Sequence, residues 1–237
     1  MTVDSSPILI AANIDALAPA LQACNVVVPK RADSRKKDHV ERYSITRLLG
    51  TLPWSPADFP LRLVKRERPD FALDRNDRTI GIELVETLTP NAGHEAFLRS
   101  NGHGPEAYFP RPMVLREKQK SGRQLVKQIE ADEMSEGWYG DSVERSWVEA
   151  MLYFIRAKID VSRKPGFQLF ERNWLLMYDN WHAPALNREL AVLRLRQALD
   201  LDPPWTTFER VFILDGSVLV ALEHGSAQLF LRRDPGT

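Results

Sequence analysis

The stretch Thr79–Glu86, with the sequence TIGIELVE, limits the fold of this chain more than any other feature. Its residues are mostly β-branched or aliphatic, which predicts a β-strand. Successive side chains of a strand point to opposite sides of the sheet. The two sides are Gly81, Glu83, Val85 and Thr87, and Ile80, Ile82, Leu84 and Glu86. We expect a central strand whose aliphatic side packs on helices, with Glu83 on the side that has little apolar bulk.

The rest of the chain alternates between strand-like and helix-like patterns, which is typical of α/β proteins. Helices are predicted at 38–52 with Asp38 as N-cap, at about 114–134, at 142–163, and after Asn187; strands are predicted at 61–64, from Phe71, at 173–181, and two or three times in the tail from 208. Residues 89–112 are rich in Gly, Pro, Asn and His and indicate a long loop or insertion. We expect residues 1–30 to pack as an N-terminal segment on one α/β domain of residues 31–237, with an insertion at about 91–141.

The charge of the chain is zero overall but unevenly distributed. Its 237 residues include 32 Lys and Arg, 32 Asp and Glu and 43% hydrophobic residues, which excludes a uniformly basic or disordered protein. Residues 30–68 hold eleven basic and five acidic residues, a balance of +6, and residues 111–128 hold six and one, a balance of +5. Two interpretations are open for these segments: they form a surface that binds a polyanion, or they are solvated faces of helices. The residues selected as nucleic-acid contacts are Lys36, Lys37, Arg116, Lys118, Lys120 and Arg123.

The single cysteine, Cys24, excludes a disulfide framework. No stretch approaches the roughly 20 apolar residues that cross a bilayer. We therefore expect a cytoplasmic protein without a membrane partner.

Two carboxylates are expected to meet at one edge of the sheet. Asp70 stands where the strand at Phe71 begins, and a turn at 74–77 would fold Glu83 beside it. Paired carboxylates bind a hard divalent cation such as Mg²⁺ together with water and phosphate. That arrangement is what phosphodiester hydrolysis needs.

These residues resemble the PD-(D/E)XK nuclease superfamily, whose members share the restriction-endonuclease-like fold. The resemblance rests on Pro69-Asp70-Phe71, a hairpin, and Ile80-Gly81-Ile82-Glu83, with a carboxylate-bearing helix before them and a helix and buried strand after them. It implies a central mixed sheet flanked by helices, a metal site of Asp70 and Glu83 for Mg²⁺ or Mn²⁺, and Glu41 as a supporting carboxylate. It also implies a nuclease that acts in restriction, repair or phage defence, with DNA rather than RNA as the expected substrate. We also expect extra strands at the C-terminus and include a homodimer among the partners.

The family's lysine, two residues after the glutamate, is replaced by Val85. Lys158 is the candidate replacement because it falls inside the apolar stripe of its helix, at helical spacing from Trp147, Met151 and Phe154. A lysine in that position either extends past the edge to water or pairs with buried carboxylates. Glu41 has two interpretations as well, because Asp38 and Glu41 have the spacing of a capping box.

The absence of the family lysine leaves a second functional hypothesis. The chain could be a degenerate nuclease fold that binds nucleic acid or another protein without cleaving anything. A cation within hydrogen-bond reach of Asp70 and Glu83 would favour the enzyme, and apolar surroundings would favour the binding module.

Overall fold

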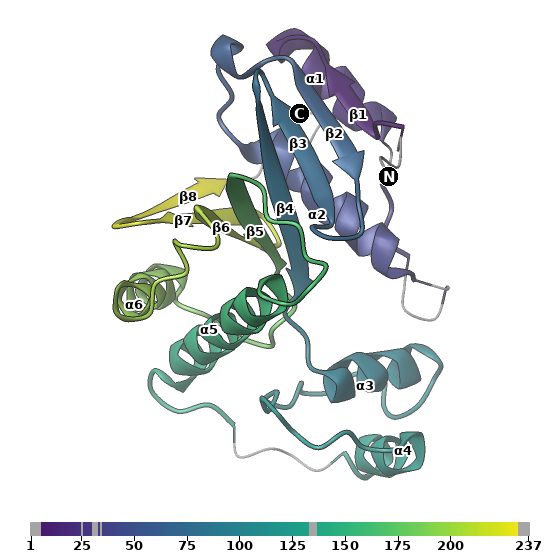
Figure 1. Cartoon of the computed structure of the whole chain (residues 1–237). Helices are drawn as coiled ribbons and strands as arrows, with labels where there is room; N and C mark the ends of the chain where they lie inside the picture. Colours follow the sequence, from purple (N-terminus) through teal and green to yellow (C-terminus); the bar gives the residue numbers. More distant parts are fainter. Residues whose placement is uncertain (1–5, 25, 30–32, 34, 133–136, 232–237) are drawn as a thin grey trace.

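The chain forms one mixed eight-stranded sheet with helices on both faces (Figure 1). The computed structural model describes residues 6–24, 26–29, 33, 35–132 and 137–231. Lys30 and Arg31 of the first basic segment lie outside these ranges. No helix in the described ranges is long and apolar enough to cross a membrane.

The strands lie in the sheet in chain order, β1 to β8. They are β1 (Leu9–Ala11), β2 (Leu61–Lys65), β3 (Phe71–Arg75), β4 (Arg78–Glu86), β5 (Arg172–Tyr178), β6 (Arg210–Asp215), β7 (Val218–Glu223) and β8 (Ser226–Leu231). The pairs β4–β5 and β5–β6 are parallel, and all other pairs are antiparallel. A parallel pair needs a crossover, and helices supply it in both cases.

The two faces of the sheet are covered by different helices. The helices are α1 (Ile14–Ala23), α2 (Lys37–Thr51), α3 (Pro90–Ser100), α4 (Gly122–Ala131), α5 (Ser142–Ser162) and α6 (Arg188–Leu201), with a short 3₁₀ turn η1 (Pro56–Asp58). Leucines and isoleucines of α1 and α2 pack on one face, and buried side chains of α5 and α6 pack on the other. Helices α3 and α4 lie beyond the end of the sheet (Figure 1).

Most of the predicted elements are confirmed, including the central position of β4 and the helices α2, α5 and α6. Ile80, Ile82 and Leu84 belong to the core on the α1 and α2 side, whereas Val85 packs against the core on the α5 and α6 side. The tail forms three strands, with turns at Gly216-Ser217 and His224-Gly225. The sheet is therefore an α/β sheet flanked by helices, as expected.

Two predictions between β4 and β5 are correct only in part. The expected loop at 89–112 contains α3, because Thr89 caps the helix by accepting a hydrogen bond from Ala92 N and Pro90 occupies the first turn, where its missing N–H costs nothing. The helix expected at about 114–134 begins only at Gly122. Ser121 and Gln124 form a capping box there, and Arg116 has a positive φ of 59° that stops a helix earlier.

Candidate active site

Asp70 is positioned by the end of the β3–β4 pairing. The paired residues run from Arg75 opposite Arg78 to Phe71 opposite Ile82. The pairing of β3 with β4 therefore ends at Ile82, one residue before Glu83. The backbone N–H of Leu84 consequently has no strand partner on this side, and it donates to Asp70 Oδ2 at 2.8 Å. This bond holds the Asp70 carboxylate beside β4.

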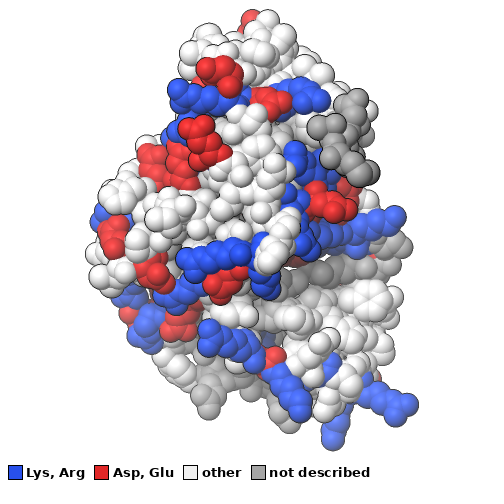
Figure 2. Space-filling model, viewed as in Figure 1, with Lys and Arg blue, Asp and Glu red and all other residues white. Residues whose placement is uncertain are grey.

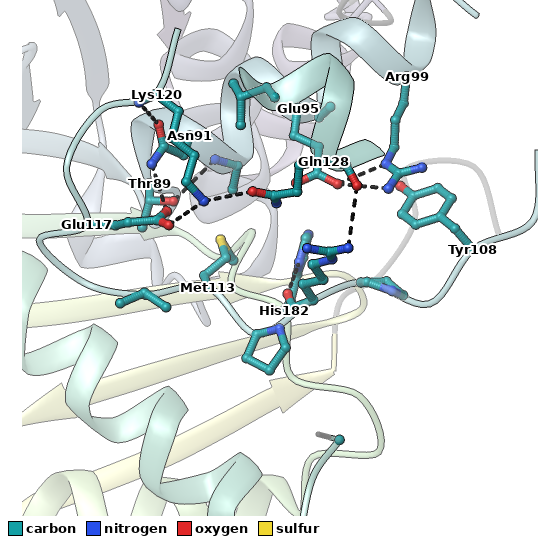
Figure 3. A pocket seen from close by; sticks show the side chains of 18 residues that line it. Thr89, Asn91, Glu95, Arg99, Tyr108, Met113, Glu117, Lys120, Gln128 and His182 are labelled. Atoms are coloured by element: carbon teal, nitrogen blue, oxygen red, sulfur yellow. Dashed lines mark hydrogen bonds and ion pairs between the residues drawn. The ribbon is translucent and has the colours of Figure 1, made fainter. Parts of the chain in front are cut away.

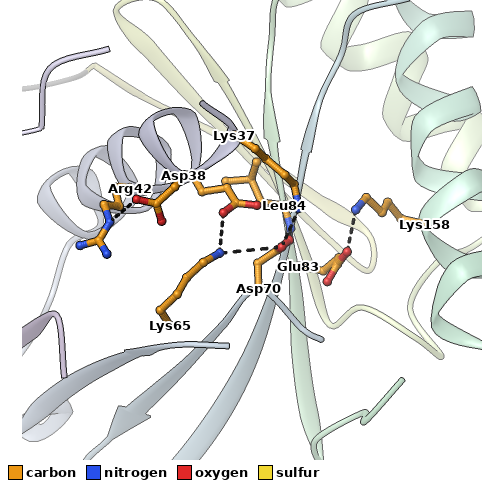
Figure 4. A network of polar contacts seen from close by, with 9 residues as sticks. Lys37, Asp38, Arg42, Lys65, Asp70, Glu83, Leu84 and Lys158 are labelled. Atoms are coloured by element: carbon orange, nitrogen blue, oxygen red, sulfur yellow. Dashed lines mark hydrogen bonds and ion pairs between the residues drawn. The ribbon is translucent and has the colours of Figure 1, made fainter. Parts of the chain in front are cut away.

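Glu83 receives a hydrogen bond from Lys158. The Nζ of Lys158, on α5, lies 2.6 Å from Glu83 Oε1, and the two side chains are 18% and 8% exposed. Of the two alternatives for Lys158, the structure shows pairing with a buried carboxylate (Figure 4). The other oxygen, Glu83 Oε2, is buried without a hydrogen-bond partner among the described residues. Burial raises the pKa of Glu83, and Lys158 offsets this only in part.

Glu41 is turned toward the same place from α2. Its side chain is 3% exposed and contacts the ammonium groups of Lys37, at 2.7 Å, and Lys65. The capping-box interpretation is wrong, and so is Asp38 as N-cap. Lys36 is the N-cap, and the Asp38 carboxylate instead pairs with Arg42 at 2.7 Å.

Lys37 and Lys65 connect Glu41 to Asp70. Lys37 Nζ lies 3.2 Å from Asp70 Oδ1, and Lys65 Nζ lies 4.0 Å from the same oxygen. Three ammonium groups, from Lys37, Lys65 and Lys158, therefore face three carboxylates (Figure 4). Lys37 was selected from the sequence as a nucleic-acid contact, and its 74% exposed side chain also contacts the carboxylates.

Lys65 is the residue that sequence reasoning missed. It pairs with Phe71 across the β2–β3 hairpin, which brings it next to Asp70. The signal was present, because the strand at 61–64 and the strand from Phe71 are close enough to form a hairpin. A hairpin of these two strands predicts that Lys65 lies next to Asp70.

The carboxylates differ in how easily they ionise. Burial would raise the pKa of Glu41, but the ammonium groups of Lys37 and Lys65 outweigh it and hold that pKa below its usual value. Burial raises the pKa of Asp70 above its usual value despite the bond from Leu84 N. Burial alone would lower the pKa of Lys37, but the carboxylates of Glu41 and Asp70 beside it outweigh this effect and raise that pKa. Neighbouring carboxylates with raised pKa values, such as Asp70 and Glu83, are common in functional sites.

A cavity of about 350 Å³ opens beside these residues. Its lining combines basic, acidic and aliphatic side chains: Arg35, Lys36, Lys37, Val40, Glu41, Leu84, Val85, Glu86 and Lys158. Val85, at the position of the family lysine, is therefore part of its wall. Glu86 is the last residue of β4 and pairs with Arg35 at 3.0 Å.

The donor set fits a magnesium ion with few protein ligands. No group of three or more His, Cys, Asp and Glu side chains suited to a metal occurs in the described parts of the chain. Mg²⁺ is usually held by only one or two carboxylates plus water and substrate phosphate. Asp70 and Glu83 would provide these two: Glu83 Oε2 has no hydrogen-bond partner among the described residues, whereas the Asp70 oxygens accept from Leu84 N and contact Lys37.

The other basic residues that the sequence predicts as nucleic-acid contacts lie outside this cluster. Arg116 lies over the ring of Tyr153 on α5, 5.5 Å from its centroid. Lys120 pairs with Glu117 at 2.6 Å, and Lys118 and Arg123 are exposed. Only Lys36 and Lys37 of that set line the cavity.

Comparisons with protein-family models, with curated proteins and with solved structures gave no match to this chain.

Proposed function

We propose that the chain is a metal-dependent nuclease that hydrolyses phosphodiester bonds, with DNA as the substrate, in the cytoplasm. The observation that carries the proposal is the Glu83 carboxylate, which lies close enough to Asp70 for the two charges to interact (Figure 4). It binds Lys158 through one oxygen, while the other has no hydrogen-bond partner among the described residues. The proposed fold is restriction-endonuclease-like, in which Lys158 takes the role of the lysine that Val85 replaces.

Asp70 and Glu83 would hold the Mg²⁺ or Mn²⁺ ion. When bound, such an ion lowers the pKa of a water and neutralises the charge that develops on a scissile phosphate. Lys158 keeps the Glu83 carboxylate oriented through its hydrogen bond. Its ammonium group also adds positive charge where the phosphate oxygens become more negative.

Lys36 and Lys37 provide charge for the substrate backbone. Both line the cavity, and the Lys37 side chain is 74% exposed, so it can reach a phosphate without leaving a buried position. Contacts of this kind provide affinity that falls with salt concentration.

The test is cleavage of plasmid and single-stranded DNA with Mg²⁺ or Mn²⁺. We expect the wild type to cleave and the variants Asp70→Asn, Glu83→Gln and Lys158→Met to lose at least about a hundredfold in rate. Asp200→Asn and Lys164→Met, at exposed positions with no role in the cluster, are the matched controls. Cleavage that persists at the wild-type rate in both carboxylate variants contradicts the proposed site.

A nucleic-acid-binding module without cleavage is the second candidate. It is favoured by the three ammonium groups, which neutralise the three carboxylates without a metal ion. Salt-dependent DNA binding by the wild type, with no cleavage under any metal condition, would establish it. A protein that neither binds nor cleaves nucleic acid contradicts both candidates.

A further inference from the structure

The segment between β4 and β5 carries the exposed aromatic side chains of the described chain. They are Phe97 (44% exposed), Tyr108 (39%), Phe109 (86%) and Tyr139 (73%). Aromatic rings are large apolar surfaces that proteins usually bury. Among the described residues, all four aromatic side chains of this kind lie in this one segment.

A second cavity, of about 440 Å³, lies in the same segment. Its walls come from α3, α4 and the chain between them, together with Thr89, Gly137 and His182 (Figure 3). Ala92, Ala96, Met113 and Leu125 contribute apolar surface, while amide, carboxylate and guanidinium groups provide hydrogen-bonding partners. Ligand sites commonly combine such walls with a few polar groups.

Tyr108 is held in position at this cavity by Arg99. The guanidinium carbon of Arg99 lies 3.6 Å from the centroid of the Tyr108 ring, and its Nη2 lies 2.9 Å from the Glu95 carboxylate. The Arg99 side chain is 10% exposed, and its Nη1 has no hydrogen-bond partner among the described residues. Figure 3 shows Arg99 and Tyr108 at one side of the cavity and Lys120 at the other.

The lining of the cavity carries charges of both signs, with one more cation than carboxylates. Arg99, Arg111 and Lys120 line it together with two carboxylates, Glu95 and Glu117. Between α3 and the end of α4 four cations are exposed, Arg116, Lys118, Arg123 and Lys127, together with the acidic Glu106, Glu117 and Glu130. On the face shown in Figure 2, Lys and Arg side chains project from the lower part of the molecule, where α3 and α4 lie. Exposed aromatic rings among cations are how proteins bind single-stranded nucleic acid, because bases stack on rings and phosphates contact cations.

We propose that this segment binds single-stranded nucleic acid, with one unpaired base in the 440 Å³ cavity and a neighbouring base on Phe109. The inference rests on the proposed nuclease function and specifies its substrate as a single strand or an unpaired end. The two sites are adjacent along the chain. Glu86 lines the first cavity and Thr89 the second, and three residues span at most about 10 Å.

Binding without cleavage tests this inference separately from catalysis. Anisotropy of fluorescent oligo(dT) and of a hairpin duplex of the same length is measured with EDTA present. We expect tighter binding of oligo(dT), and about tenfold weaker binding of it by Phe109→Ala and by Tyr108→Ala. Leu201→Ala, at an 89% exposed position on α6, is the control and should bind as the wild type does.

Three outcomes overturn the inference. The first is equal affinity for the duplex and the single strand, and the second is unchanged affinity in Phe109→Ala, whose exposed side chain can be removed without affecting folding. The third is tighter binding of free dTMP than of oligo(dT), which would make a free nucleotide the occupant. A chain that prefers oligo(dT) but never cleaves would disprove the nuclease and leave this binding site intact.

Discussion

Replacing Lys158 by methionine should destabilise the protein in a way that depends on pH. The change removes the ammonium group 2.6 Å from Glu83 and leaves a carboxylate whose side chain is only 8% exposed. Removing one partner of a fully buried ion pair costs about 3–5 kcal/mol. Lys158 is 18% exposed, and Glu83 can take up a proton, so we expect a smaller loss of about 2–3 kcal/mol at pH 8.

The direction of the pH effect follows from the pKa of Glu83. Burial already raises this pKa above 4.5, and loss of the Lys158 charge raises it further. The folded protein then binds the proton more tightly than the unfolded chain does, so stability is retained below about pH 4.5 and declines as pH rises through the folded pKa. Lys158→Met should therefore differ little from the wild type at pH 5 and most at pH 8.

Urea unfolding followed by circular dichroism at both pH values measures the effect. A loss of 2–3 kcal/mol corresponds to a melting temperature lower by about 4–12 °C for a chain of this size. In the double variant Lys158→Met with Glu83→Gln, both charges are absent and most of the stability should return, with a coupling free energy of about 2 kcal/mol. Lys164→Met is the control. Equal losses at pH 5 and pH 8, or additive effects in the double variant, would refute this reasoning.

Three further changes test the site and its support. Val85→Lys in the Lys158→Met background places a cation at the family position on the cavity wall and should recover part of the lost cleavage; no recovery in a folded variant argues against the resemblance. The pKa of Asp70 is raised above 3.8, so its contribution to stability declines as pH rises through the folded pKa; the stability of Asp70→Asn relative to the wild type should grow with pH above about 4, and a flat difference contradicts this. A Cβ at Gly81 would lie 2.6 Å from a side-chain oxygen and 3.0 Å from Pro69, so Gly81→Ala should cost about 1–3 kcal/mol in a urea titration. A Cβ at Gly50 of α2 would lie 3.4 Å from its nearest neighbour, Leu21 of α1, so Gly50→Ala should be neutral or stabilising.

The regular elements were largely predictable because their patterns are local. The strand β4 alternates with period two, and Ile45, Leu48 and Leu49 of α2 recur at helical spacing, so both were found without knowledge of their neighbours. Helix α3 was missed for the same reason. Gly, Pro, Asn and His are loop residues on average, but here Thr89 and Pro90 form a helix start.

That Asp70 and Glu83 lie close together was predictable because a short turn joins β3 and β4, and such a hairpin permits few registers. Lys65 comes to the site through the β2–β3 hairpin, whereas the other residues of the site depend on helix packing. Helix α2 brings Glu41 and Lys37 from one face of the sheet, and α5 brings Lys158 from the other. Hydrophobic periodicity shows which side of a helix is buried but not which strand it crosses, because burial of apolar surface is non-directional. Packing on the sheet therefore decided which cations meet the carboxylates.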